Sequence, residues 1–432
     1  MISIINLLRL IFLIIILLPL YFFSKKRFIF YFFYNAGPSF IKLGQMLATR
    51  PDLIGNDISS ILSRFQDKMK PFNIKKVKKI LDKEYGGDFS KKFKKFNYHP
   101  IASASIAQVH KAISIDNKEM AIKIIRPNIR KIVKRDIKTL RLLVILTNII
   151  AKPIANFFQD ILNLLKETSK SELDLTIEAT NCSLLKSNLK NLKGFYVPSV
   201  FWDLTTKNIL AIEWLNGIAF SNKELIKKST INKDEIAKNL VVSYFHQVYK
   251  YGFFHGDMHP GNLFLLENGD IGIVDFGIMG IIDNNTRIAI AKIVIGFINK
   301  DYDKIAQLHI SSGLVPPNVN AQKLALSCRK IGETVVDSKV KDIPLAQLLQ
   351  NLIAMTQDYK MSTKPELLLL QKTKLLVEGI GTTLNPDLNI WDHAKPFMKE
   401  WSKSNLGFDA KIVELIVEIA NIVKKHYNIK NI

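Results

Sequence analysis

The residues of this sequence that could do chemistry gather in one polar loop and directly after the next turn. Within residues 253–264, which read FFHGDMHPGNLF, Asp257 and Asn262 lie five residues apart. Asp275 follows Asp257 by 18 residues and precedes Phe-Gly. Magnesium prefers hard oxygen ligands and usually takes only one or two protein carboxylates, with phosphate and water completing its shell. We therefore interpret Asn262 and Asp275 as metal ligands, and Asp257 as the group that orients or deprotonates an attacking hydroxyl or water.

Two histidines in the same loop raise the alternative of a zinc site. His255 and His259 are four residues apart, the spacing of two zinc ligands on one helix face. Pro260 and Gly261 disfavour a helix here. We therefore expect both imidazoles to brace the loop through hydrogen bonds to the backbone.

A nucleotide also needs a cation for its phosphates, and Lys123 is the candidate. It is a charged residue with apolar neighbours on both sides, within the strand-like segment Glu119–Ile125. An unpaired ammonium among apolar neighbours is costly, so a carboxylate partner is expected. Glu172, Asp174 and Glu178 are the candidates downstream. Asp174 and Glu178 share a helix face, and spacing alone does not choose between them.

The segment that precedes this strand is rich in small residues. It comprises Ile101, Ala102, Ser103, Ala104, Ser105, Ile106, Ala107, Gln108 and Val109. Alanine and serine allow a backbone to approach phosphates but restrict the positive φ angles that glycine permits. The Ser103 and Ser105 hydroxyls are candidate donors to phosphate oxygens. The alternative is a small-residue strand that only packs tightly.

Composition limits the kind of protein that carries these residues. The chain has 432 residues, 48% hydrophobic and 23% charged, which excludes a mainly disordered or fibrous protein. Its two cysteines exclude a disulfide scaffold or a Cys-rich metal site and indicate a reducing compartment. The formal charge of +23 favours an anionic partner: nucleic acid, anionic lipid or a phosphorylated small molecule.

Periodicity and turn residues predict the elements that position the candidate residues. In the first half of the chain we expect helices over 36–97, strands from about 98 to 125, a helix over 128–191 and strand-like structure over 195–213. A linker at 213–217 follows. In the second half we expect a helix over 233–251, a loop over 254–262, a hairpin that turns at Asn268-Gly269, and helices over 284–432. Lys42 and Gln45 lie three apart in the first helical region and, taken alone, are surface residues.

The N-terminus raises the question of a membrane. Leu10–Phe23 is uninterrupted and apolar, and basic residues 25–27 follow it. A spanning helix needs about 20 apolar residues, which residues 2–23 provide only if Arg9 snorkels, and Pro19 would kink it. We favour a single membrane anchor with the remaining chain in the cytoplasm. A helix that lies in the membrane interface and a cleaved signal peptide are the alternatives.

A lysine-rich stretch, residues 68–95, holds 11 lysines and three acids. A solvated helix face is the simplest interpretation, and a membrane-surface patch is the alternative. We expect no nucleic-acid partner, because the stretch offers no aromatic or Arg-rich surface for bases.

Taken together, the sequence resembles the UbiB family of atypical protein-kinase-like proteins over about residues 35–405. The matching segments are GPSFIKLGQMLATRPDL, PIASASIAQVH, AIKIIRP, ELDLTIEATN, FFHGDMHPGN, VDFG, FINKDYDKIAQLHISSGLVPP, LLLLQKTKLLVEGIGTTLNP and WDHAKPFMKEW. The resemblance implies an α+β, two-lobed kinase-like fold that binds Mg-ATP between its lobes. The implied domains are a hydrophobic anchor (1–34), a helical N-terminal extension (35–97), an N-lobe (98–215) and a largely helical C-lobe (216–432).

The resemblance also implies roles for residues that spacing does not explain. Lys42 and Gln45 match the Lys-x-Gly-Gln motif of an extension that, in the family, folds over the active site as a lid and blocks a peptide groove. Glu172 and Asp174 match the Glu-x-Asp motif that this extension contacts.

By the same resemblance, Glu178 becomes the partner of Lys123. Residues 101–109 become the loop that covers ATP, and Glu213 begins the hinge that meets adenine. Asp257, Asn262 and Asp275 keep the roles inferred above.

Two departures from the expected pattern stand out. Gly256 occupies the position of the Arg in the kinase His-Arg-Asp, and no Ala-Pro-Glu segment follows Asp275, so control by an activation loop is not expected. Bacterial members typically carry a C-terminal pair of hydrophobic spans, and this sequence ends at Ile432 without them. The N-terminal apolar run is then expected to replace that anchor.

The implied function is that of an ATPase at the bacterial inner membrane, facing the cytoplasm, that supports ubiquinone biosynthesis. Its expected partners are membrane lipid, prenylated phenol intermediates and other enzymes of the pathway. A protein or small-molecule kinase and a non-catalytic nucleotide-binding scaffold are the alternatives. A hydroxylase is disfavoured, because the sequence has no dinucleotide Gly-x-Gly-x-x-Gly motif, haem site or two-His-one-carboxylate set.

Overall fold

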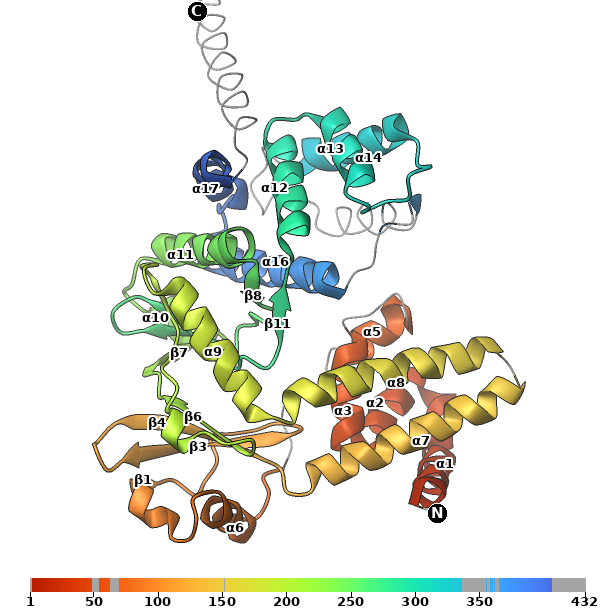
Figure 1. Ribbon diagram of the computed structural model, residues 1–432, viewed down its shortest axis with the longest axis vertical. Helices are drawn as coiled ribbons and strands as arrows, with labels where there is room; N and C mark the ends of the chain where they lie inside the picture. The colour runs from red at the N-terminus through yellow and green to blue at the C-terminus, as the bar shows by residue number, and fades with distance from the viewer. Residues whose placement is uncertain are drawn as a thin grey trace, which may run out of the picture. The chain divides into compact units, whose positions relative to one another are not determined.

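The computed structural model describes residues 2–48, 54–62, 70–150, 152–335, 355, 358, 359, 361 and 365–405, and shows an α+β protein (Figure 1). The chain forms two compact units. Unit 1 comprises Met1–Leu184, Pro198–Trp214 and Asp275–Gly277. Unit 2 comprises Leu185–Val197, Leu215–Val274 and Ile278–Ile432. One division between the units falls between Trp214 and Leu215, while Asp275–Gly277 groups with unit 1 and residues 185–197 group with unit 2.

Unit 1 contains a small antiparallel sheet with a helix on one face. Its strands are β1 (Phe93–Phe96), β2 (Ala102–Ser103), β3 (Ala107–Ser114), β4 (Glu119–Ile125) and β6 (Ile209–Glu213), in the order β1-β3-β4-β6, with β2 beside β3. The strand predicted over Glu119–Ile125 is thus confirmed. Met120, Ile122 and Ile124 are buried in one cluster with Val77 and Leu81 of α6 (Ile74–Glu84). Because side chains alternate along a strand, Lys123 lies on the other face.

The prediction of helix throughout residues 36–97 is wrong at its end. Phe89–Lys92 forms a single turn of 3₁₀-helix (η1), and Phe93–Phe96 is strand β1. The Phe93 and Phe96 rings lie 5.6 Å apart in the hydrophobic cluster of the sheet. Aromatic residues suit a half-buried strand, and this tertiary packing prevails over the lysine-rich helical pattern around them.

The predicted helical stretch 128–191 is confirmed in kind but contains three helices, α7 (Ile129–Ile150), α8 (Lys152–Glu172) and α9 (Leu175–Leu189). Helices α7 and α8 lie side by side (Figure 1). The strand-like prediction over 195–213 is met by β5 (Phe195–Tyr196) and β6, with a 3₁₀ turn, η2 (Trp202–Leu204), between them.

The N-terminal helices of unit 1 pack against α7 and α8. They are α1 (Ile2–Phe23), α2 (Lys25–Ala36), α3 (Pro38–Ala48) and α5 (Asn56–Leu62). Leu10 and Phe40 share a buried cluster with Leu140 and Ile161. Polar contacts fix α1 as well, because Arg9 Nη2 donates to the Ala36 carbonyl at 2.8 Å.

One helix of the described residues, Ile4–Phe23, is long and apolar enough to cross a membrane by length and composition. Its mean hydropathy is 2.5, and 11% of its most apolar window is buried. A signal sequence passes the same test, so this helix alone is weak evidence for a span.

Unit 2 holds two small sheets beneath its helices. One has the order β5-β10-β9-β7, with β7 (Gly217–Ala219), β9 (Leu263–Leu266) and β10 (Ile271–Ile273), and the other pairs β8 (Phe253–His255) with β11 (Met279–Ile281). The hairpin predicted at Asn268-Gly269 joins β9 and β10, and Gly269 adopts the positive φ, 87°, that the turn requires. The predicted loop over 254–262 is shorter than expected, since its first residues belong to β8.

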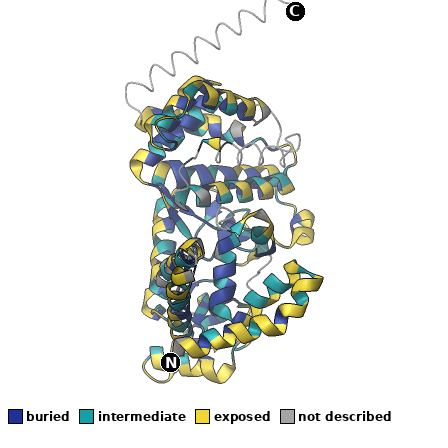
Figure 2. Ribbon diagram, turned by 90° about the vertical axis from the view of Figure 1, so that its right-hand side faces the viewer, coloured by how far each residue is buried: buried dark blue, intermediate teal, exposed yellow. Residues whose placement is uncertain are grey.

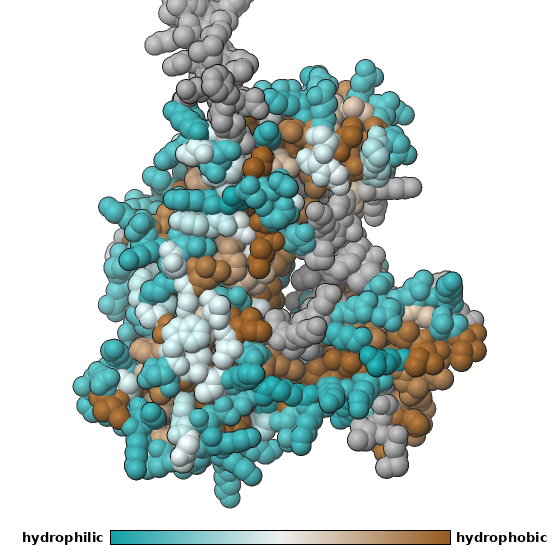
Figure 3. All heavy atoms as spheres, viewed as in Figure 1, coloured by the Kyte–Doolittle hydropathy of each residue, from teal (hydrophilic) through white to brown (hydrophobic). Residues whose placement is uncertain are grey.

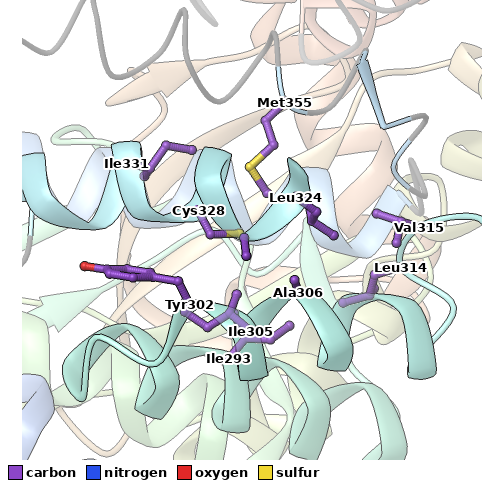
Figure 4. Close-up of a cluster of buried hydrophobic side chains, with 11 residues drawn as sticks. Ile293, Tyr302, Ile305, Ala306, Leu314, Val315, Leu324, Cys328, Ile331 and Met355 are labelled. Carbon is purple, nitrogen blue, oxygen red and sulfur yellow. The ribbon is translucent and has the colours of Figure 1, made fainter. Parts of the chain in front are cut away.

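The helices of unit 2 are α10 (Lys223–Lys228), α11 (Lys233–Phe245), a π-helical turn η3 (His246–Tyr251), α12 (Asn284–Ile298), α13 (Tyr302–Ser311), α14 (Ala321–Val335), α16 (Pro365–Leu384) and α17 (Ile390–Asn405). Helices α12, α13 and α14 share a core that includes Ile305, Leu324 and Cys328 (Figure 4). Buried residues, in dark blue, alternate with exposed ones along the helices (Figure 2). The helical prediction over 284–432 is confirmed in the described ranges, and 336–354 and 406–432 lie outside them.

Candidate functional site

Lys123 is the centre of an ion-pair cluster in unit 1. Its Nζ lies 2.8 and 2.9 Å from the two carboxylate oxygens of Glu178, and 3.0 Å from Oδ1 of Asp275. The side chains of Lys123 and Glu178 are 16% and 7% exposed, whereas that of Asp275 is 44% exposed. We call these three residues the Lys123 cluster. Two of its charges are buried, and the third faces solvent, where a metal or phosphate can reach it.

The start of α9 decides which acid pairs with Lys123. Asp174 lies just before α9, where its Oδ1 accepts from the Thr176 N–H at 3.1 Å and caps the helix. Glu178 lies one turn later and reaches Lys123. The structure therefore resolves the alternative that spacing left open, in favour of the pairing that the family resemblance implied.

Burial opposes the charged form of both partners in this pair. It alone would lower the pKa of the Lys123 ammonium, but the Asp275 and Glu178 carboxylates outweigh it and raise that pKa above its ordinary value. Burial raises the pKa of the Glu178 carboxyl to about 7, against the lowering effect of Lys123. Lys123 is thus firmly cationic, and Glu178 depends on that cation to stay ionised.

Asp275 is held in a backbone conformation that is uncommon for a non-glycine residue. Its φ is +63°, in the left-handed region. The next residue, Phe276, is completely buried, and its carbonyl accepts from Asn181 Nδ2 at 3.0 Å. Because Asn181 lies on α9, three residues after Glu178, one helix face fixes both the partner of Lys123 and the chain beside Asp275.

The loop that contains Asp257 lies in unit 2 and is braced by His255. The imidazole of His255 is fully buried, and its Nδ1 accepts from the Asp257 N–H at 3.1 Å. Its Nε2 donates to the Val274 carbonyl at 3.2 Å. We call residues 255–262 the Asp257 loop.

The second histidine of the Asp257 loop also bonds to backbone. His259 Nδ1 accepts from the Gly261 N–H at 2.9 Å. Both histidines therefore brace the loop, as predicted. No group of three or more His, Cys, Asp or Glu residues that could hold a metal occurs within the described ranges.

Asn262 is buried, and its side-chain amide is fixed to the backbone of the Asp257 loop. Its Nδ2 donates to the Asp257 carbonyl at 3.0 Å, and its own carbonyl accepts from the Val274 N–H at 3.0 Å. Asp275 directly follows Val274 in the sequence. An amide oxygen and a partly exposed carboxylate are hard donors, so Asn262 and Asp275 fit Mg²⁺ by ligand type.

The small-residue segment 101–109 forms β2, a turn and the start of β3. Arg126 fixes the turn, because its Nε donates to the Ala104 carbonyl and its Nη2 to Ser103 Oγ, each at 2.9 Å. Ile101 and Ala102 are exposed, and Ser105 is buried. The role of this segment in covering a nucleotide stays a prediction.

Glu213 is the last residue of β6, and its carboxylate accepts from the Ser199 N–H at 3.0 Å. Residues 214–216 then lead to β7. The structure thus places Glu213 at the end of a strand, and contact with adenine stays a prediction.

The proposed lid residues lie on unit 1. Lys42 and Gln45 belong to α3 and are both partly buried rather than fully exposed, which differs from the surface position expected from spacing alone. Asp174 Oδ2 lies 3.9 Å from Lys207 Nζ. Glu172 ends α8, and its side chain lies outside the described residues.

Sequence reasoning missed Lys372. From α16, its Nζ lies 2.9 Å from Asp257 Oδ1. The signal that could have found it is the one that identified Lys123, a lysine in a mainly apolar segment, here LLLLQKTKLL.

Two family models match this chain in succession. The one described as the ABC1 atypical kinase-like domain matches residues 64–309, and the one described as the UbiB helical domain matches residues 328–389.

Relatives and a solved structure agree with these matches. A "Probable protein kinase UbiB" from Marinobacter nauticus is 34% identical over 379 residues, which cover 86% of this chain and 69% of that protein. A protein of the same name from Cellvibrio japonicus is 35% identical over 382 residues, which cover 86% of this chain and 68% of that protein. The solved structure, titled as the complex of Rv3197 with erythromycin from Mycobacterium tuberculosis, has a TM-score of 0.59 and 25% identity, over 82% of this chain and 90% of that one. The expected α+β kinase-like fold is confirmed.

Proposed function

Because the chain belongs to the UbiB family of atypical kinase-like proteins, we propose that it is a membrane-associated ATPase that supports ubiquinone biosynthesis. The observation that carries the proposal is the Lys123 cluster. A buried lysine that is paired with a glutamate, next to a partly exposed aspartate before Phe-Gly, is the arrangement that kinase-like enzymes use for nucleotide phosphates.

In this proposal the Lys123 cluster and the Asp257 loop act on the same Mg-ATP. Lys123 contacts the phosphates, Glu178 orients it, and Asn262 and Asp275 hold the metal. The magnesium ion, when bound, neutralises charge on the phosphates. Asp257 orients the attacking water or hydroxyl. The segment 101–109 covers the nucleotide, and Glu213 begins the hinge that contacts adenine.

The biological role is tested by complementation. A strain that lacks this gene is supplied with the wild-type chain or with Asp275→Asn at matched protein levels, and its quinones are profiled. We expect the wild type to restore ubiquinone and the variant not to restore it, because the substitution removes the anionic ligand. Unchanged ubiquinone in the deletion strain would contradict the assignment to this pathway.

The acceptor of the phosphoryl group distinguishes the proposed ATPase from a second candidate. The names of the relatives favour a kinase that acts on a protein or small molecule. Labelled ATP separates the two, since an ATPase releases inorganic phosphate whereas a kinase labels an acceptor. We propose prenylated phenols and other enzymes of the pathway as the partners, so turnover is measured with and without a prenylated phenol.

We further propose that α1 binds the cytoplasmic face of the bacterial inner membrane. Asn6 Nδ2 donates to Asp136 Oδ1 of α7 at 3.1 Å, and this polar pair is buried within unit 1. A spanning α1 would carry these polar groups into lipid, so the pairing favours a helix in the interface, with the basic residues 25–27 near anionic headgroups.

The apolar surface of unit 1 supports this membrane proposal. Exposed side chains of α1 include Ile4, Ile5, Leu8, Ile11, Phe12, Ile15, Ile16, Phe22 and Phe23. Further exposed apolar residues, Ile145, Leu146 and Ile149, lie at the end of α7, where Figure 3 shows hydrophobic surface in brown.

Substituting two exposed residues of α1 tests the membrane contact. Phe12 and Ile15 are 64% and 60% exposed. We expect the double substitution Phe12→Glu/Ile15→Glu to weaken binding to phosphatidylglycerol vesicles about a hundredfold or more, because burial of each such side chain contributes about 1.5–3 kcal/mol. Leu326→Glu on α14, equally exposed, is the control and retains binding. Equal sedimentation of the two variants with vesicles would exclude α1 as the contact.

A further inference from the structure

One face of α16 contacts three consecutive residues of the Asp257 loop. Lys372 reaches the Asp257 carboxylate, and Thr373 Oγ1, which donates to the Leu369 carbonyl of its own helix at 2.9 Å, lies 3.4 Å from the His255 carbonyl. Leu369 packs against Gly256, where an added Cβ would lie 2.6 Å from Leu369 Cδ2. Positions 369, 372 and 373 have the i, i+3, i+4 spacing of a single helix face.

The glycine at 256 permits this close approach. A Cβ at that position would clash with the end of the Leu369 side chain, which would have to move. Gly256 replaces the arginine of the kinase His-Arg-Asp, so the departure noted in the sequence has a packing reason.

The Lys372 ammonium restricts how the Asp257 carboxylate is presented. It contacts Oδ1, and His259 Nε2 lies 3.9 Å from Oδ2. The two side chains are 33% and 24% exposed, so the pair is partly shielded from water. With Oδ1 fixed by a charge-assisted hydrogen bond, Oδ2 is the oxygen left to face an incoming hydroxyl or water.

We propose that Lys372 is a positioning residue of the active site, which α16 supplies to the Asp257 loop. It fixes the carboxylate of Asp257 in one orientation so that Oδ2 meets the attacking group. This inference rests on the proposed role of Asp257, and it gives the second matched region, residues 328–389, a part in the chemistry.

The test compares Lys372→Met with Lys374→Met in the full-length protein. Lys374 lies on the same helix, and its ammonium is 3.4 Å from Glu378 instead of Asp257. We expect Lys372→Met to lower kcat for ATP hydrolysis about a hundredfold, with the KM for ATP and the Kd for Mg-ADP unchanged. Lys374→Met retains the wild-type kcat, and Lys372→Arg recovers part of the loss because it keeps the charge.

A double substitution separates positioning from a general loss of structure. If Lys372 acts through Asp257, Asp257→Asn/Lys372→Met has the same kcat as Asp257→Asn alone. A further loss in the double variant, or a wild-type kcat in Lys372→Met, would overturn the inference. A parallel rise in KM and Kd would also overturn it, since that result assigns Lys372 to nucleotide binding. Failure of the wild type to bind Mg-ADP would instead refute the proposed function itself.

Discussion

Replacing Lys123 by Met is expected to lower ATP turnover by about a hundredfold or more, because a fixed cation that stabilises charge on the transferred group is lost. The affinity for Mg-ATP should fall as well, since the ammonium would contact phosphate before the reaction. Steady-state hydrolysis and titration with a fluorescent ATP analogue measure the two effects. Turnover within a few-fold of wild type would remove Lys123 from the nucleotide site.

The same substitution is expected to destabilise unit 1. It leaves the Glu178 carboxylate buried without its cation, and removing one partner of a buried ion pair costs about 3–5 kcal/mol. Lys111→Met is the matched control, because Lys111 pairs with Glu119 on the exposed part of the same sheet, where an ion pair contributes about 0–1 kcal/mol. In urea unfolding, Lys123→Met should therefore lower the free energy of unfolding by more than Lys111→Met does. Equal stabilities would indicate that Glu178 is not dependent on Lys123.

Asp257→Asn is expected to reduce turnover about 10²–10⁴-fold, the usual contribution of a positioned acid or base. The affinity for Mg-ATP should stay within a few-fold of wild type, because Asn262 and Asp275, and not Asp257, are the proposed metal ligands. The loop itself should persist, since His255 and Asn262 bond to the backbone of residue 257 and not to its side chain.

Asp270→Asn is the control for this substitution. Asp270 lies in the exposed β9–β10 hairpin, where its side chain accepts from Asn268 Nδ2 at 2.8 Å. It should hydrolyse ATP at the wild-type rate. If Asp257→Asn also retained turnover, Asp257 would have no role in catalysis, and a nucleotide-binding scaffold would be the better interpretation.

Local sequence patterns predicted the elements whose pairing partners lie close by in the chain. The strand around Lys123 is short, β-rich and ended by Arg126-Pro127, and the β9–β10 hairpin turns at an Asn-Gly pair. The histidines of the Asp257 loop were predictable for a similar reason, since Pro260 and Gly261 left only a bracing role. In each case the determining residues lie within a few positions of one another.

Contacts between distant segments could not be predicted in this way. The choice of Glu178 over Asp174 depends on how α9 begins, which helical spacing does not specify. Lys372 lies 115 residues after Asp257, so only the packed fold brings them together. The arginine at 126 fixes the small-residue turn through groups 22 and 23 residues earlier, and no periodic pattern indicates such a contact.

The most direct test is a calorimetric titration of Mg-ADP into the wild type, Asp275→Asn, Asn262→Ala and the double variant. We expect each chain to bind a single Mg-ADP if one nucleotide is served by Lys123, Asp257, Asn262 and Asp275. Each single substitution should then remove the dependence of ADP affinity on magnesium. The double variant then binds no more weakly than the weaker single variant, because both ligands hold the same ion. Two nucleotides per chain, or losses that add independently, would contradict the shared site.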